Sequence, residues 1–438
     1  MFSRPNHTPD RGRRGTVAVM VAVCLPLLMA VVALSLEGSL LLDNRRRAQT
    51  ASDAAALAAA GDLFATYTNG TPSDDGKDSC GTIATHAKAV AATNGYTNDT
   101  TNSTVTVNIP PQSGDNVGTP GYAEVLITFN QRRGFSNIFG SGDLPVVARS
   151  VARGQWAPSS IGILVTDPTG SGSLTINGNG LGYTPYAPVL VNSTAPDALT
   201  ASGSSASYTA DSFEVTGGTQ LQYAGNLTGP IHTGVPPTPD PFRFLQPPDP
   251  TLMTRRSKNT AVVDNLGGGA KLYHLLPGVY DGGLSFSGQE SVDMAPGVYY
   301  MRGGGFKFSG NVGTSLTATG VFLYNAPAAN GSTTNTDISI TGSASVTWTP
   351  PLSGPYQGMT LWQARGLTTT ATISGGGSMS ISGAFYFPSA MLSVSGGGGA
   401  YIGNQIVTYR LSMGGNGSFN CPWNPLFLPK IREYKLTE

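Results

Sequence analysis

The chain has 438 residues, a formal net charge of zero, 58 Gly, 31 Pro and three Cys, and only 11% of its residues are charged. Average soluble proteins carry about 25% charged residues. The absence of a basic excess argues against a nucleic-acid partner, because such binding draws on Lys and Arg at phosphates. Three unevenly placed Cys exclude a disulfide-rich scaffold and a cysteine-built metal site.

The shortage of charge is confined to one part of the chain. Residues 1–154 hold 13 Lys or Arg and 12 Asp or Glu, whereas residues 259–429 hold five of each. Gly and Pro together permit disorder, but many short Val, Ile, Leu, Phe and Tyr alternations favour folded structure. The sequence therefore predicts at least two regions of different character.

Residues 1–15 form a basic tail, and the stretch from Thr16 to Leu36 contains no charge. Its 21 residues give about 31 Å of helix, the thickness of a bilayer core. We predict an uncleaved transmembrane anchor bounded by Thr16 and Leu36, with a kink at Pro26. A cleaved signal peptide and a buried core helix are the two alternatives.

The helical pattern continues to about residue 65. Ala48, Ala51, Ala55 and Ala59 recur every three or four residues and form a stripe of small apolar side chains. Small side chains let two helices approach closely. The stripe is open to two interpretations, packing against a partner helix or packing against the next domain of the same chain. Arg45, Gln49 and Asp53 form a polar stripe beside it.

The segment RRGTVAVMVAVCLPLLMAVVALSLEGSLLLDNRRRAQTASDAAALAAA resembles the N-terminal segment of TadG-like proteins of the tight-adherence (Flp) pilus-assembly systems. The resemblance rests on Arg14-Gly15, Pro26, Glu37 and the Ala-rich block that starts at Gln49. Related pilins carry a Glu five residues after the processing Gly, and that position here is Met20. The resemblance therefore implies a single-pass protein that stays in the bacterial inner membrane.

The orientation of the anchor follows from its flanks. Arg4, Arg11, Arg13 and Arg14 precede the span, and three further Arg residues at 45–47 follow it. The positive-inside rule favours a cytoplasmic N-terminus. The polar, Gly-rich remainder favours export of the C-terminal part.

Residues 66–154 are typical of a small α/β module. A helix is predicted from Thr82 to Asn94, and strands are predicted from Val105 to Ile109, from Tyr122 to Phe129 and from Val146 to Val151. Asp74, Asp75 and Asp78 lack the regular spacing of a calcium loop, so a solvated loop is expected. The segment QRRGFSNIFG is expected to be an exposed loop, with headgroup or partner contact as the alternative.

A recurring theme fills residues 155–429: two alternating apolar residues, then Ser or Thr, then Gly. It starts at Leu174, Phe213, Leu284, Phe306, Ile338, Met379, Leu392 and Leu411. Short strands that end in Gly turns at spacings near 20 residues predict stacked units that share one core, a parallel β-solenoid. A β-sandwich is the competing architecture. The resemblance to large TadG-like envelope proteins implies a right-handed β-helix.

Within this region, Ile338, Ile340, Leu392 and Val394 are expected to point inward, with Ser and Thr outward. Residues 230–258 carry eight prolines and are expected to be either a linker between two solenoid parts or a strap across one face. Residues 430–438 are expected to be a C-terminal tail.

The sequence offers little chemistry for catalysis. Sparse carboxylates occur in the main solenoid region, and no catalytic, cofactor-binding or metal-ligating set is recognised. These carboxylates are Asp264, Asp281, Glu290, Asp293 and Asp337. Cys80 and Cys421 lie in different predicted domains, so a disulfide between them is not expected.

The fold class expected is thus mixed: a transmembrane helix with a helical extension, a small α/β module and an all-β solenoid. The function expected is that of a membrane-anchored structural envelope protein associated with Flp pilus assembly, with the membrane, pilus-assembly or envelope proteins and a glycan as candidate partners. The alternatives are a surface adhesin or matrix protein unrelated to pili, and a carbohydrate-active β-helix enzyme.

Overall fold

The computed structural model describes residues 14–63, 81–138, 140–396 and 399–438. They fall into two compact units, one made of Met1–Trp156 with Arg432–Glu438 and the other of Ala157–Ile431. The two units are described separately.

The first unit places two helices against a four-stranded sheet with the order β1-β2-β3-β33, in which β2 is antiparallel to both neighbours. Its elements are α1 (Arg14–Asp62), α2 (Thr82–Thr93), β1 (Ser103–Asn108), β2 (Tyr122–Gln131), β3 (Leu144–Pro158) and β33 (Lys430–Leu436). The short helix and the three strands predicted from the sequence are all present. Ala residues of both helices and Val125, Ile127 and Ala148 of the sheet form the core between them.

The prediction of a C-terminal tail at residues 430–438 is wrong. β33 lies beside β3 in the sheet. Beyond it, the Val151 amide donates to the Glu438 carbonyl (3.0 Å) and the Thr437 amide donates to the Val151 carbonyl (2.8 Å). A seven-residue strand forms here because β3 would otherwise leave its outer row of backbone donors and acceptors unpaired.

The second unit is a β-rich stack of coils, each contributing up to three short strands. Each strand pairs in parallel with the equivalent strand of the next coil, as β20, β23 and β26 do, and as β21, β24 and β27 do. Among the described residues of this unit, the one antiparallel pair is β15–β16, at one end of the stack. A β-sandwich is built mainly from antiparallel sheets. The prediction of stacked parallel units is therefore confirmed. The parallel pairing does not support the alternative of a β-sandwich.

Successive strands of a coil lie on three faces of the stack. The first face is formed by β4 (Ile163–Val165), β7 (Val189–Val191), β10 (Phe213–Val215), β13 (Ile231–Thr233), β14 (Arg255–Arg256), β17 (Gly278–Asp281), β20 (Gly297–Arg302), β23 (Val321–Ala326), β26 (Met359–Gln363) and the first parts of β29 (Ala384–Gly396) and β31 (Gln405–Gly415). The second face is formed by β5 (Leu174–Ile176), β8 (Leu199–Ala201), β11 (Thr219–Leu221), β18 (Leu284–Gly288), β21 (Phe306–Gly310), β24 (Ile338–Gly342), β27 (Ala371–Gly375) and the later parts of β29 and β31. The third face is formed by β6 (Leu181–Thr184), β9 (Ser207–Ala210), β12 (Leu227–Thr228), β15 (Val262–Gly267), β16 (Ala270–Leu275), β19 (Glu290–Met294), β22 (Ser315–Ala318), β25 (Ser345–Trp348), β28 (Met379–Ile381), β30 (Gly399–Ile402) and β32 (Ser418–Asn420).

The core of this unit runs through the centre of the stack. On the second face Ile338, Ile340, Leu392 and Val394 are buried in it, as the alternating pattern predicts. Small polar side chains alternate with them and stack outside, as where Ser395 Oγ donates to Ser374 Oγ at 3.0 Å. Neutral Ser and Thr stack without the repulsion that like charges would meet, which accounts for the low charge of this region.

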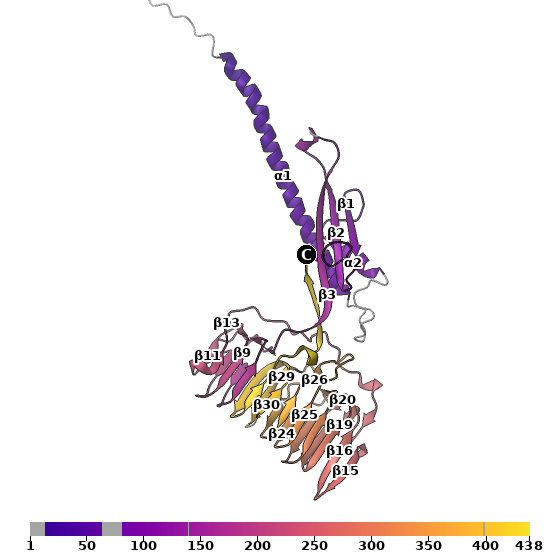
Figure 1. Cartoon of the computed structure of the whole chain (residues 1–438), viewed down its shortest axis with the longest axis vertical. Helices are drawn as coiled ribbons and strands as arrows, with labels where there is room; N and C mark the ends of the chain where they lie inside the picture. The colour runs from indigo at the N-terminus through magenta and orange to yellow at the C-terminus, as the bar shows by residue number, and fades with distance from the viewer. Residues whose placement is uncertain (1–13, 64–80, 139, 397–398) are drawn as a thin grey trace, which may run out of the picture. The chain divides into compact units, whose positions relative to one another are not determined.

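The order of coils in space differs from their order along the chain. The first coil, with β4 and β5, pairs with the last coil through β31. We call this junction the seam. From the seam, successive coils extend to one end of the stack, which they reach at β13. The chain then crosses to the opposite end, where β14 begins a second series of coils that returns to the seam at β31. Figure 1 accordingly shows β11 and β13 near one end of the stack, β15 near the other, and β29 and β30 between them.

Residues 234–254 connect the two ends of the stack and form a strap over the first face. Phe242 of the strap is fully buried against Trp362 and Tyr386. Arg365 donates to the carbonyls of Phe242 (2.7 Å) and Leu245 (3.1 Å). For residues 230–258 the sequence predicts either a linker or a strap, and the structure supports the strap. β13 and β14 lie near the two ends of that range.

Because the strap covers it, the first face is apolar on both sides. β23 and β26 are buried along their whole lengths, with Leu323 and Leu361 in the central core and Tyr324 and Trp362 in the cluster beneath the strap. The rule of outward Ser and Thr therefore fails on this face. Continuous apolar runs are the pattern of strands that are covered on both faces.

Candidate functional site

The N-terminal half of α1 is the part of the chain suited to a membrane. Among the described residues, α1 is the one helix long and apolar enough to cross a bilayer. Thr16 and Leu36 both lie within it, Pro26 lies inside the helix, and the Leu36 side chain is exposed. Large apolar side chains from Val17 to Leu42 are exposed around this segment.

The stripe of small residues lies in the C-terminal half of α1. Ala48, Ala51, Ala55 and Ala59 are at most 1% exposed. The first three pack in one cluster with β2 and β3 residues, and Ala59 packs with Ala123 of β2 and with α2. The stripe is thus covered by the protein's own first unit, and the interpretation as a surface for a partner helix is not supported. Small side chains are needed here because the sheet approaches the helix backbone closely.

The buried row of α1 begins further upstream than the sequence analysis placed it. Ala33 and Glu37 are buried, and Leu41 and Asn44 are half-buried, on the same helical face as Ala48. Spacings of four, four, three and four residues join them to the Ala stripe. This signal was available in the sequence, but a carboxylate in an apolar run concealed it, because Glu is rarely buried without partners.

Polar side chains of α1 bind the β2–β3 hairpin at successive levels of the helix. Ser52 Oγ donates to the Val125 carbonyl at 2.9 Å, and Asn44 Nδ2 donates to Gln131 Oε1 at 2.9 Å. Gln49 Nε2 donates to Asp53 and to Ser150 Oγ, both at 2.8 Å. The predicted polar stripe of Gln49 and Asp53 therefore faces β3, while Arg45 is exposed.

The level nearest the apolar end of α1 is built around Glu37. Its carboxylate accepts hydrogen bonds from the amides of Gly134 (3.1 Å) and Ser136 (2.8 Å) and from Ser136 Oγ (2.6 Å). These donors lie in the loop that joins β2 to β3, which contains a 3-10 turn at Phe135–Ile138. Glu37 is 6% exposed, so the loop supplies the donors that water would otherwise provide.

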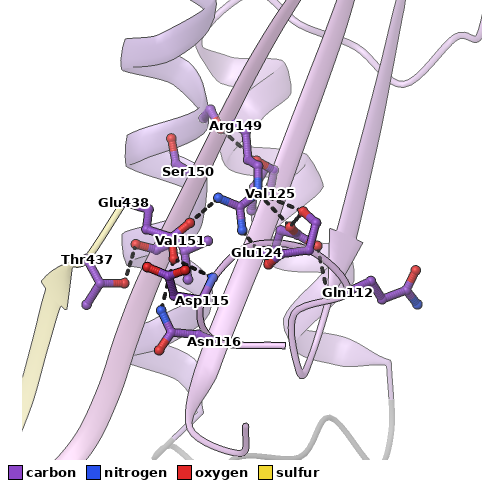
Figure 2. Close-up of polar contacts among 12 residues, drawn as sticks. Gln112, Asp115, Asn116, Glu124, Val125, Arg149, Ser150, Val151, Thr437 and Glu438 are labelled. Atoms are coloured by element: carbon purple, nitrogen blue, oxygen red, sulfur yellow. Dashed lines mark hydrogen bonds and ion pairs between the residues drawn. The ribbon is translucent and has the colours of Figure 1, made fainter. Parts of the chain in front are cut away.

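The opposite face of the sheet carries a second polar cluster, centred on Arg149. Figure 2 shows Arg149 of β3 between Glu124 of β2 and Glu438. Arg149 Nε donates to Glu124 Oε1 at 2.7 Å, and its Nη1 pairs with the Glu438 carboxylate. Glu438 also accepts from Asn116 Nδ2 at 3.1 Å. The cluster joins the loop before β2, the sheet and the end of the chain.

Glu124 is fully buried and ionised. Burial alone would raise its pKa, but donors from Ser113, Asn108, the Gln112 amide and Arg149 together lower the pKa to about 2. The same cluster holds the pKa of Glu438 below its usual value, chiefly through the hydrogen bond from Arg149. This arrangement stabilises the fold and leaves no free carboxylate at Glu124 for proton transfer.

The five carboxylates considered for catalysis each have a basic side chain as partner. Their pairs are Asp264 and Asp293 with His274, Asp281 with Arg302, Glu290 with Lys258 and Asp337 with Lys307. The sequence showed no basic partner for Glu290 or Asp293. Those partners come from stacked or hairpin-paired strands and from the turn before β15, so they are distant in the sequence.

The described residues include no cluster of three or more His, Cys, Asp or Glu suited to a metal ion. Cys421 is a free thiol and fully buried. Cys80 and the Asp74, Asp75 and Asp78 cluster lie outside the described residues.

Comparison with known families finds a match to the description Flp pilus-assembly TadE/G-like over residues 15–62. These residues are similar to a TadE/G-like segment. The match coincides with α1 and covers both the apolar half and the Ala stripe. No curated protein and no solved structure matches the chain. The TadE/G-like likeness therefore belongs to α1, and it fits a membrane-anchored protein associated with pilus assembly.

Proposed function

We propose that the chain is a structural protein of the bacterial inner membrane that serves Flp pilus assembly. α1 crosses the membrane once with the N-terminus in the cytoplasm, and the rest of the chain is exported. The parallel sheets of the second unit form a right-handed β-helix, a solenoid whose Ser- and Thr-rich second face contacts an envelope protein or a glycan. The protein has no catalytic role.

The observation that carries this proposal is that α1 contains both an exposed apolar segment and a row of buried residues. One helix joins an exposed apolar segment to a buried row that the first unit needs for its core. Ala33 and Glu37 belong to both parts, because they lie near the end of the apolar segment and are buried. Cleavage of a signal peptide near residue 36 would remove Ala33 from the folded unit and expose the end of α1 at Glu37. This supports a retained anchor.

The structural role is supported by the charges of the stack. Each of the five carboxylates named above is bound to a Lys, Arg or His side chain. Glycoside hydrolysis requires two carboxyl groups that face each other across a substrate. Asp281, Glu290 and Asp337 lie in separate ion pairs, and the His274 imidazole binds both Asp264 and Asp293, so no two of these carboxylates face each other across free space.

The test follows the full chain in a bacterium that assembles Flp pili. We expect the protein to resist carbonate extraction from the inner membrane, to keep residues 16–36 by mass spectrometry, and to lose residues after 63 to protease added to spheroplasts. Deletion of the gene should reduce the number of assembled pili. A chain that is cleaved near residue 36, or whose second unit is protected from protease, would contradict the anchoring. Normal piliation with reduced surface adhesion would favour the adhesin function instead.

A further inference from the structure

The loop between β2 and β3 lies beside the apolar part of α1. Its Gly134 and Ser136 hold the Glu37 carboxylate, and Ala33, one turn closer to the N-terminus, is buried at the same contact. We call residues 132–138 the hairpin tip. In Figure 1, β2 and β3 run beside the lower half of α1, and the hairpin points toward its apolar end.

The apolar surface of α1 extends past this contact. Around the level of Ala33 and Glu37 the helix exposes Leu34, Leu36 and Leu40, each by more than half, and Leu42 is 61% exposed. The next charged residue is Asp43. Ten residues separate Ala33 from Asp43, which is about 15 Å of helix. The hairpin tip therefore lies within the apolar belt of α1 and not beyond its polar end.

We propose that the hairpin tip is a second membrane contact, seated among the lipid headgroups and the outer acyl chains beside α1. This inference rests on the proposed anchoring by α1. If a bilayer covers the exposed leucines of the helix, it also reaches the tip, because both lie at the same level.

The chemistry of the tip fits that place. A carboxylate at membrane depth is costly unless it is paired or hydrogen-bonded, and the tip gives Glu37 three donors. Arg132 and Arg133 begin the tip, and long basic side chains extend toward lipid phosphates while their stems stay in the apolar layer. Arg133 Nε donates to the Gly142 carbonyl at 2.9 Å, which holds the base of the tip together.

Lipid is a better occupant than a partner protein. Apolar side chains are exposed on every remaining face of α1 at this level, not on a single stripe. A partner helix would cover one stripe, whereas lipid covers all of them.

The test uses the full chain in vesicles of phosphatidylcholine and phosphatidylglycerol. Three single-label proteins carry an environment-sensitive fluorophore. One keeps the native Cys24, and the others carry Asn137→Cys in the tip or Thr119→Cys at the other end of β2. Cys80→Ser is present in all three, and Cys24→Ser in the last two. Cys421 is fully buried and needs no replacement. Lipids spin-labelled near the headgroup or near the chain end serve as quenchers.

We expect chain-end quenching at Cys24, several-fold stronger headgroup quenching at Asn137→Cys than at Thr119→Cys, and no quenching at Thr119→Cys. Quenching at Cys24 with no difference between the other two labels would overturn the tip contact and leave the anchor intact. No quenching at Cys24 would overturn the anchor itself. A label at Asn137 that is shielded from aqueous iodide but not quenched by lipid would overturn the lipid contact and assign the tip to a contact with a second copy of the chain.

Discussion

At the scale of single residues, the first unit depends on charged groups that its fold removes from water. Glu124 is fully buried, yet the donors around it lower its pKa to about 2 from an ordinary value of 4.5. The folded protein therefore binds a proton at Glu124 less readily than the unfolded chain does. The stability that this group contributes is complete above about pH 4.5 and is lost as the pH falls toward about 2.

We predict that Glu124→Gln lowers the free energy of unfolding at pH 7 by about 2 kcal/mol, because Arg149 keeps Glu438 but loses its buried partner. The variant should also lose less stability than the wild type between pH 4.5 and 2. Urea unfolding of the detergent-solubilised protein at a series of pH values measures both effects. Equal acid sensitivity of the two proteins would show that Glu124 is not the group responsible.

The residues also show where sequence reasoning succeeds and where it stops. The Ala stripe and the inward Ile338 and Ile340 follow from periodicity, because they repeat at short spacing. The partners of Glu37 do not, since residues 134 and 136 lie about a hundred positions away. The same holds for Lys258 beside Glu290, where the turn before β15 supplies the cation. Periodicity identifies which face is buried, but not which distant strand or loop covers it.

At the scale of elements, the Gly-rich turns permit one coil to lie on the next. Gly304 has a φ of 75°, and a Cβ placed on it would lie 1.9 Å from the Gly282 carbonyl oxygen of the neighbouring coil. Gly282 has a similar φ of 82°, but a Cβ placed there meets nothing within 4 Å. The two positions share the same backbone strain and differ in the space available.

We predict that Gly282→Ala costs about 1 to 2 kcal/mol, the cost of a side chain in the left-handed region. Gly304→Ala should cost about 3 kcal/mol or more, because the coils must also separate. Denaturant unfolding followed by tryptophan fluorescence reports on the stack, since Trp348 and Trp362 are buried there. Similar losses in both variants would contradict the role of close coil contact.

The strap offers a second matched pair. Phe242 is fully buried beneath it, whereas Phe244 is 64% exposed two residues later. We predict that Phe242→Ala lowers the unfolding free energy by about 3 to 5 kcal/mol and that Phe244→Ala changes it by about 0.5 kcal/mol or less. Protease sensitivity of residues 234–254 should rise in the first variant alone. Unchanged sensitivity in Phe242→Ala would show that Arg365 holds the strap without the aromatic contact.

At the scale of the whole molecule, the seam joins the first and last coils of the stack. Asp167 at the end of β4 accepts from Arg410 Nε of β31 at 2.5 Å and is 1% exposed. Burial would raise the pKa of Asp167, but the amides of Thr169 and Gly170 and the Arg410 side chain together lower it. The ion pair thus ties two segments that are 243 residues apart in sequence.

We predict that Asp167→Asn raises hydrogen exchange in β4 and β31 and leaves β18 and β21 unchanged, because the lost charge leaves Arg410 without its buried partner at the seam. Asp281→Asn is the control, since it removes the ion pair between Asp281 and Arg302, in which the Asp281 side chain is 44% exposed. Exposed pairs contribute little to stability. Faster exchange spread over the whole stack, or none at the seam, would contradict a local lock.

The overall order of coils could not be derived from the sequence, because the repeats do not show which coils that are distant in the sequence pair with each other. Repeats spaced near 20 residues predict stacking of neighbours in sequence, and most coils obey this. Nothing in the local pattern of β4 or β31 marks them as partners. The prolines of the strap were the one visible sign that the chain leaves the stack and returns to it elsewhere.

The strap also couples the length of the stack to the length of a single loop. From β13 to β14 the first face contains ten strand pairings, which span about 48 Å at 4.8 Å per pairing. The 21 residues at 234–254 reach about 65 Å in an extended proline-rich conformation. This reach exceeds the span by about 17 Å, so the strap at its present length could still cross a stack with one coil duplicated at either end, which adds about 4.8 Å. Related chains can therefore gain or lose a few coils at the ends while the seam stays fixed, and a stack that exceeds the reach of the strap should carry a longer strap.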